Sequence, residues 1–148
     1  MSSTRESVIG AVVDRLEMIL ISGGFATDAG VHVFTGETPT FGPDDSTAAI
    51  ALVVGSDDPG HQGENVAYTL PLDVQVIAPV GVGALLAIEA TIADVKRAIE
   101  TDRDLGGLLP HRGLERGPTR QLPREEGSDF IGAAVEYRAY IVEQWGNP

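Results

Sequence analysis

The sequence contains no cysteine, and this absence excludes disulfide bonds, thiolate metal sites and a cysteine nucleophile. It also contains no apolar run close to the roughly 20 residues that a membrane-spanning helix needs, so we expect no membrane partner. The first residues place charges within a helical pattern, which is unlike a signal peptide. These absences predict an intracellular, soluble protein with an independent apolar core.

Basic residues are absent from a long middle segment. No Lys or Arg lies between Arg15 and Lys96, whereas eleven Asp or Glu residues do. The net charge of −12 argues against a broad surface that neutralises nucleic-acid phosphates. Half of the ten basic residues then follow within a short stretch: Arg103, Arg112, Arg116, Arg120 and Arg124. The chain therefore has an acidic half and a short basic segment.

Residues 65–101 form the most regular part of the sequence. The alternation in 65–78 predicts a long strand with one apolar face, and Pro71 predicts an edge or a bend there because proline lacks a ladder donor. After a Pro/Gly break, apolar residues recur with helical spacing from Ala84. The predicted helix stripe is Leu85, Ile88, Ile92, Val95 and Ile99. Its charged residues, Asp94 among them, are predicted on the opposite side.

The remaining segments supply partners for this strand and helix. Ser3 and Glu6 fit a capping box for a first helix that ends before Gly23. Short strands are predicted at 30–35 and 48–54, a turn at 57–60, and a last strand at 129–145. The chain length of 148 residues predicts a single domain. We expect an α+β fold, with a mostly antiparallel sheet of four to five strands and two main helices packed on one face.

Residues 102–127 have little periodicity and hold five arginines, several glycines and three prolines. Loops this long are uncommon in compact domains, and the leucines of this segment argue against full disorder. We interpret it as an extended arm, with a short hairpin as one possible form. Its arginines suit carboxylates and phosphates alike. A solvated loop and a direct DNA clamp are the alternatives to a protein contact.

Catalytic chemistry is hard to find in the sequence. Asp57, Asp58, His61 and Glu64 gather in one predicted loop, but their spacing matches no EF-hand, and a solvated turn explains them. No nucleophile elbow is present, so a hydrolase of that design is not expected. We expect no catalytic residue, cofactor or metal. A small metal- or ligand-binding domain that uses this loop is the alternative of another class.

The charge split favours contact between copies of the chain. A basic patch that meets a different, acidic patch on an identical neighbour makes a heterologous contact, which closes into a ring when the rotation allows. The predicted interface residues are Arg103, Arg112, Arg116, Arg120, Arg124, Asp44, Asp45, Asp57 and Asp58.

The order of these features resembles the tail-terminator (tail-completion) proteins of long-tailed bacteriophages, over nearly the whole chain. The segments that carry the resemblance are Arg-Leu-Glu (15–17), Gly-Val-His-Val-Phe (30–34), Leu-Pro-Leu-Asp-Val-Gln-Val (70–76), Asp-Val-Lys-Arg-Ala-Ile-Glu (94–100), Asp-Arg-Asp-Leu-Gly-Gly-Leu (102–108), Val-Glu-Tyr-Arg-Ala-Tyr (135–140) and the closing Trp145-Gly146. The match is one of organisation, without an invariant motif.

This resemblance implies a virion protein that forms a homohexameric ring. The ring would cap the tail tube protein, stop tube growth and meet the head–tail connector or stopper protein. Genomic DNA would pass through its lumen without specific binding, which suits an acidic subunit. Assembly would take place in the host cytoplasm. A connector or stopper neck protein is the alternative within the same class.

Overall fold

The computed structural model describes residues 2–37, 48–123 and 126–148. In these residues, two helices and six strands form a mixed α+β fold, with two short 3-10 turns between the first helix and the first strand. The fold class is as predicted, and the sheet has six strands where four to five were expected. In chain order the elements are α1 (Thr4–Glu17), η1 (Ile21–Gly23), η2 (Ala29–Val31), β1 (Val33–Phe34), β2 (Ala49–Val54), β3 (Asp58–Gln62), β4 (Asn65–Pro79), α2 (Ala84–Ile99), β5 (Leu114–Gln121) and β6 (Phe130–Gln144).

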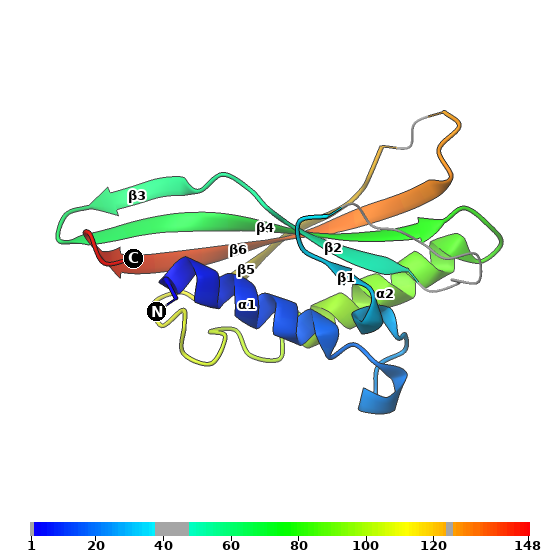
Figure 1. Ribbon diagram of the computed structural model, residues 1–148, viewed down its shortest axis with the longest axis horizontal. Coiled ribbons are helices and arrows are strands. Elements are labelled where there is room, and N and C mark those ends of the chain that lie inside the picture. Colours follow the sequence, from blue (N-terminus) through cyan, green and yellow to red (C-terminus); the bar gives the residue numbers. More distant parts are fainter. Residues whose placement is uncertain (1, 38–47, 124–125) are drawn as a thin grey trace.

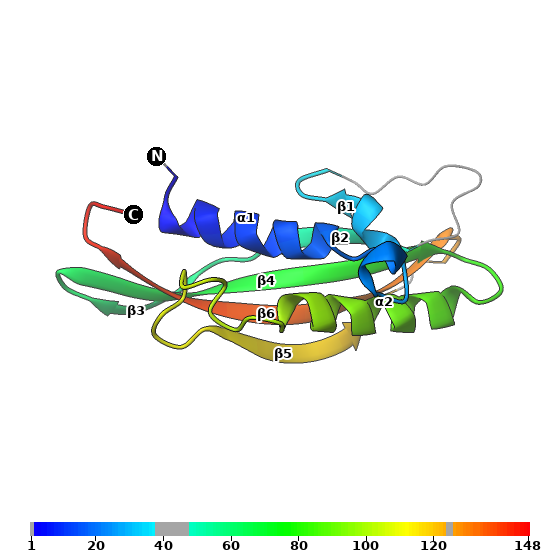
Figure 2. The ribbon, with the colours of Figure 1, turned by 90° about the horizontal axis from the view of Figure 1, so that it is seen from below.

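The strands form one sheet in the order β1-β2-β4-β6-β5, and β3 pairs with the outer part of β4. All pairs are antiparallel except β1 with β2. The long strands β4 and β6 pair along their full length and run the length of the molecule (Figure 1). Both helices lie on the same face of this sheet (Figures 1 and 2), which confirms the predicted arrangement.

The covered face of the sheet is the hydrophobic core. The alternating residues of β4 predicted for one face, from Tyr68 to Val76, are buried, as are their neighbours on β6 from Ala133 to Ile141. Helix α1 contributes Val8, Val12 and Leu16 to the same core. The capping box is present, because the Ser3 side chain accepts from the Glu6 amide at 3.1 Å and the Glu6 carboxylate accepts from the Ser3 amide. The buried face of β4 and the capping box of α1 were therefore predicted correctly.

Strand β4, which contains Pro71, is paired on both sides, so of the expected edge or bend, the edge is wrong for the strand as a whole. Strand β4 is flanked by β6 on one side and, in succession, by β3 and β2 on the other. The Pro71 carbonyl accepts from the Gly55 amide at 3.0 Å, so the backbone nitrogen and carbonyl oxygen of Pro71 face the β2 side. The missing N–H therefore falls where pairing changes from β3 to β2, and the ladder with β6 is intact.

Helix α2 differs from the expected stripe at two residues. Leu85 is 57% exposed, whereas Ala84 and Ile88 turn inward. Asp94, predicted on the solvent side, is fully buried. Its carboxylate accepts from the Thr27 amide and hydroxyl at 2.8 Å each and from the Ala26 amide at 3.2 Å. The Asp94 carboxylate is tolerated in the core because hydrogen bonds from the loop before η2 offset the cost of its burial.

The predicted arm contains a strand. Residues 114–121 form β5, which pairs with β6 across an irregular register between Arg116 and Thr119. Gly117 and Pro118 occupy that irregularity, where a proline without a donor is tolerated. The predicted turn at 57–60 is partly strand β3, and the predicted strand at 30–35 shrinks to β1 after the turn η2. Period-two alternation is weak in each segment, which explains why these boundaries were missed.

Candidate assembly surfaces

The sheet face that carries no helix, called the open face below, holds several charged side chains among apolar ones. On it, Arg120 of β5 forms a two-pronged ion pair with Asp73 of β4, and both N–O distances are 2.9 Å. Gln75 donates to the same carboxylate at 3.4 Å, and Arg138 pairs with Glu136 at 3.3 Å. The ion pair raises the pKa of the Arg120 guanidinium above its ordinary value, first through the hydrogen bonds with Asp73. Positive and negative charges on this face thus meet within one subunit.

The reach of Arg120 depends on a small neighbour. Ala134 of β6 lies opposite Arg120 in the β5–β6 register and is fully buried although it lies on the open face. Its methyl group leaves room for the guanidinium to cross from β5 to β4. The same face holds Arg112, whose guanidinium stacks over the Tyr140 ring at 4.4 Å from the centroid.

Arg103 and Arg116 lie on the helix side of β5. Arg116 pairs with Glu100 at 3.5 Å, and the Nε of Arg103 donates to the Leu114 carbonyl at 3.0 Å. Both arginines line a hollow of about 400 Å³ between the end of α2 and β5. The Tyr137 hydroxyl donates to Glu100 at 2.9 Å there. Burial, with help from Glu100, raises the pKa of Tyr137 far above its ordinary value.

The predicted arginines therefore divide between the two sides of the sheet. Arg112 and Arg120 lie on the open face, and Arg103 and Arg116 lie on the helix side. Each of these four already has a partner in its own chain. Arg124 lies outside the described residues, as do Asp44 and Asp45. Sequence spacing alone could not assign faces because the irregular register in β5 shifts the alternation.

The predicted acidic residues Asp57 and Asp58 lie at the β3 end of the molecule. Asp57 forms an ion pair with Arg5 of α1 at 3.1 Å and remains about half exposed. Asp58 begins β3, whose residues are all exposed. Across the part of the chain that the structure describes, no three His, Asp or Glu side chains gather closely enough to hold a metal ion. In the same residues, no helix is long and apolar enough to cross a bilayer.

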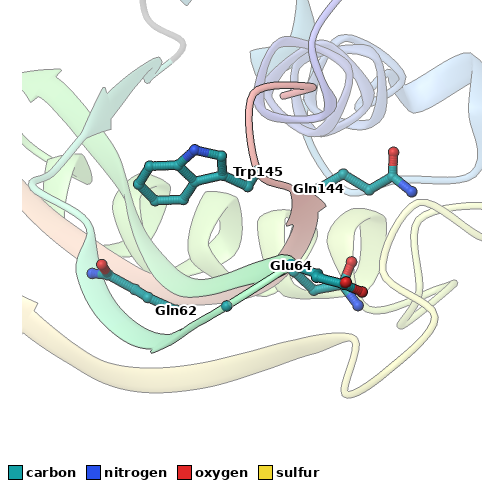
Figure 3. A pocket seen from close by; sticks show the side chains of 6 residues that line it. Gln62, Glu64, Gln144 and Trp145 are labelled. Atoms are coloured by element: carbon teal, nitrogen blue, oxygen red, sulfur yellow. The ribbon is translucent and has the colours of Figure 1, made fainter.

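A hollow beside Trp145 lies at the same end. It has a volume of about 890 Å³ and is lined by the β3–β4 turn and the end of β6 (Figure 3). Trp145, the single tryptophan of the chain, is 71% exposed, and its amide donates to the Glu64 carbonyl at 2.8 Å. Gln62 lies on the same side as the Trp145 ring, whereas the side chains of Gln144 and Glu64 point to the opposite side (Figure 3). We call this surface the tryptophan hollow.

The opposite end of the molecule is an apolar tip, formed by the turn between β4 and α2 and by the start of β6. Its exposed residues are Val80, Val82, Leu85, Leu86 and Phe130. Val82 is fully exposed between two glycines, and Gly83 has a φ of +81°, which favours glycine. This surface was not predicted from the sequence. The signal was available, because residues 76–88 carry no polar side chain although they span a turn.

The tip and the tryptophan hollow lie at opposite ends of the long axis (Figures 1 and 2). Contiguous exposed apolar patches mark protein or membrane contact sites and ligand-binding grooves. The tip therefore has the character of a contact surface.

No family model and no curated protein matches the sequence. A comparison with solved structures finds a similar fold in a chain of a virion. One match is to a chain of the structure described as "Virion of native gene transfer agent (GTA) particle", with a TM-score of 0.60 and 17% sequence identity. The alignment covers 90% of this chain and 93% of that chain. Because the identity is low, the similarity establishes a shared fold over nearly the whole of both chains.

Proposed function

We propose that the protein is a structural subunit of a phage-like virion, and specifically a tail terminator that forms a hexameric ring. The observation that carries the proposal is the near full-length fold similarity to a chain of a gene transfer agent virion. The order of sequence features, which resembles tail terminators, points in the same direction. In this role the ring caps the tail tube protein, stops its growth, meets the head-side connector and lets DNA pass.

Deletion of the gene from the particle that carries it tests this function. Electron microscopy should then show overlong tails without heads, because nothing stops tube growth. Tails of normal length beside separate heads would assign the protein to the connector or stopper instead. Intact, infectious particles would contradict a virion role altogether.

The proposal includes contact between the arginines of one copy and Asp57 and Asp58 of the next. Arg116 and Arg120 support it because each remains about half exposed while paired within its own chain. Replacing Arg112, Arg116 and Arg120 by Glu should abolish rings on tails and leave a folded subunit.

Because two of these arginines hold Glu100 and Asp73, loss of rings could also follow from loss of the internal pairs. The matched control is Glu100→Gln with Asp73→Asn, which weakens the same pairs and keeps the arginines. Rings in the control and none in the arginine variant would support the contact. Equal behaviour of the two variants would contradict it.

A further inference from the structure

We propose that the hollow between the end of α2 and strand β5, called the arginine hollow below, binds a carboxylate group that carries an apolar chain. The hollow has a volume of about 400 Å³ and is lined by Arg103, Arg116, Glu100, Tyr137, Ile99 and Leu114. The inference goes beyond the proposed virion role and does not rest on it, because one subunit supplies the whole site.

Arg103 has no carboxylate partner among the described residues. Its Nε donates to the Leu114 carbonyl at 3.0 Å, and in that part of the chain no carboxylate oxygen lies within 4 Å of its guanidinium. By contrast, Arg116 already pairs with Glu100. The terminal nitrogens of Arg103 therefore stay available, in the planar fork that fits both oxygens of a carboxylate.

The turn around Arg103 holds this side chain in place. The Leu114 amide donates to the Arg103 carbonyl at 2.8 Å, so Leu114 bonds both the backbone and the side chain of Arg103. Gly113 has a φ of +73°, and a Cβ there would lie 2.7 Å from the Arg103 carbonyl oxygen and 2.9 Å from its Cγ. Leu105 anchors the same loop in the core with a φ of +52°, which is unfavourable for leucine. A guanidinium held in this way loses less freedom when it binds a ligand.

The charge and the walls of the hollow select the ligand. Two arginines and one glutamate leave one positive charge in excess, which suits a carboxylate with a single negative charge. A phosphate with two negative charges would meet the Glu100 carboxylate. Ile99 and Leu114 are buried and apolar, so an acid with an apolar chain gains contacts that an inorganic anion does not.

Glu100 competes with the ligand for Arg116. Its Oε2 accepts from the Tyr137 hydroxyl at 2.9 Å and lies 3.5 Å from Nη1 of Arg116. The bond from the buried Tyr137 is the shorter of the two, so Glu100 keeps Tyr137 while an incoming carboxylate binds Arg116. Glu100→Gln keeps an acceptor for Tyr137 and removes the competing charge.

Butyrate is the probe, because it joins a carboxylate to a short apolar chain, and butyramide is its neutral control. Titration of the ¹⁵N-labelled full-length protein at constant ionic strength should shift the Leu114 amide signal with butyrate and not with butyramide. Arg103→Gln should weaken butyrate binding roughly tenfold or more, because charge-assisted hydrogen bonds are lost. Arg138→Gln makes the same change of charge on the open face and should bind butyrate as the unaltered protein does.

Glu100→Gln separates a binding role from a structural one. Butyrate should bind several-fold more tightly to this variant, although the variant has lost the internal ion pair of Arg116. A cluster that only stabilises the fold would lose stability without a gain in affinity. Unchanged or weaker binding by a folded Glu100→Gln protein would overturn the proposal.

Two further titrations separate the possible ligands. A terminally blocked peptide with one Glu among alanines represents a carboxylate from a protein side chain. If it shifts the same signals, the site accepts a partner's side chain, and if butyrate alone does so, the site takes a free acid; both results support a carboxylate site. Inorganic phosphate acting at lower concentration than butyrate would overturn the assignment, as would equal shifts with butyramide or no shift with either carboxylate. Since only purified protein is used, failure here leaves the deletion phenotype unaffected, and an unexpected deletion phenotype leaves the titrations standing.

Discussion

The two faces of the sheet place carboxylates in opposite settings. On the helix side, Asp94 is fully buried and accepts three hydrogen bonds from the Ala26–Thr27 loop. On the open face, Asp73 accepts two short bonds from Arg120, whose side chain is about half exposed. The contacts look equally good by distance. Their energies differ, because a buried group that loses its partners cannot turn to water, whereas an exposed one can.

This difference predicts that the hydrogen bonds on the helix side contribute more to the free energy of unfolding. The charged groups of the open face are then available to bind a partner. An exposed ion pair costs little to break, so a partner can compete for its members. A buried carboxylate that fixes a loop cannot be given up without loss of the fold. The following changes test the contrast, beginning with the largest effect.

Asp94→Ala should have the largest effect. It removes an acceptor from the Ala26 amide and from the Thr27 amide and hydroxyl in a buried place, and the free energy of unfolding should fall by about 3 kcal/mol. Asp94→Asn keeps one acceptor oxygen and should lose less. Urea denaturation followed by circular dichroism measures both. Equal stability of Asp94→Ala and the unaltered protein would contradict the role assigned to this carboxylate.

Gly30→Ala should destabilise the same side by about 2 kcal/mol through overpacking. A Cβ at this position would lie 2.7 Å from the carbonyl oxygens of Glu17 and Ile19, which belong to the backbone and cannot rotate away. Gly10→Ala within α1 is the matched control, because a Cβ there meets nothing within 4 Å. The control should hold or raise the melting temperature, since alanine favours helix. A similar change in both proteins would show that the close contact relaxes.

Tyr68→Phe should cost about 1 kcal/mol at neutral pH, because the hydroxyl donates to Glu143 at 3.1 Å. Burial, followed by the charge of Glu143, raises the pKa of Tyr68 to about 12. The unfolded chain releases this proton near pH 10, so the contribution is complete below pH 10 and is lost as pH rises through 12. Alkaline denaturation between these limits should be shallower in Tyr68→Phe, with Tyr140→Phe as the control. Identical alkaline curves for Tyr68→Phe and the unaltered protein would refute the assignment.

Arg120→Gln should have the smallest effect on stability, under about 1 kcal/mol, and less at high salt. Thermal melts at low and high salt, with Asp73→Asn as the matched partner variant, measure it. A loss as large as that of Asp94→Ala would break the contrast between the two faces.

Much of the fold was readable from the sequence because the signals are local. The alternation from Tyr68 to Val76 placed the covered face of β4, and Ser3 with Glu6 placed the start of α1. Strand β5 was not readable, since Gly117 and Pro118 interrupt its period and its pairing depends on the distant strand β6. Asp94 was misplaced for a related reason: its partners lie 67 and 68 positions earlier in the chain.

The candidate surfaces divide in the same way. The sequence by itself determined that the chain is acidic, that its arginines are grouped, and that residues 76–88 carry no polar side chain. Only the tertiary structure decided that those arginines lie on two sides of the sheet, and that the uncharged turn and Trp145 lie at opposite ends of the molecule. Composition and period are properties of neighbours along the chain, whereas a surface is set by the pairing of distant strands, which bring together groups that no local pattern connects.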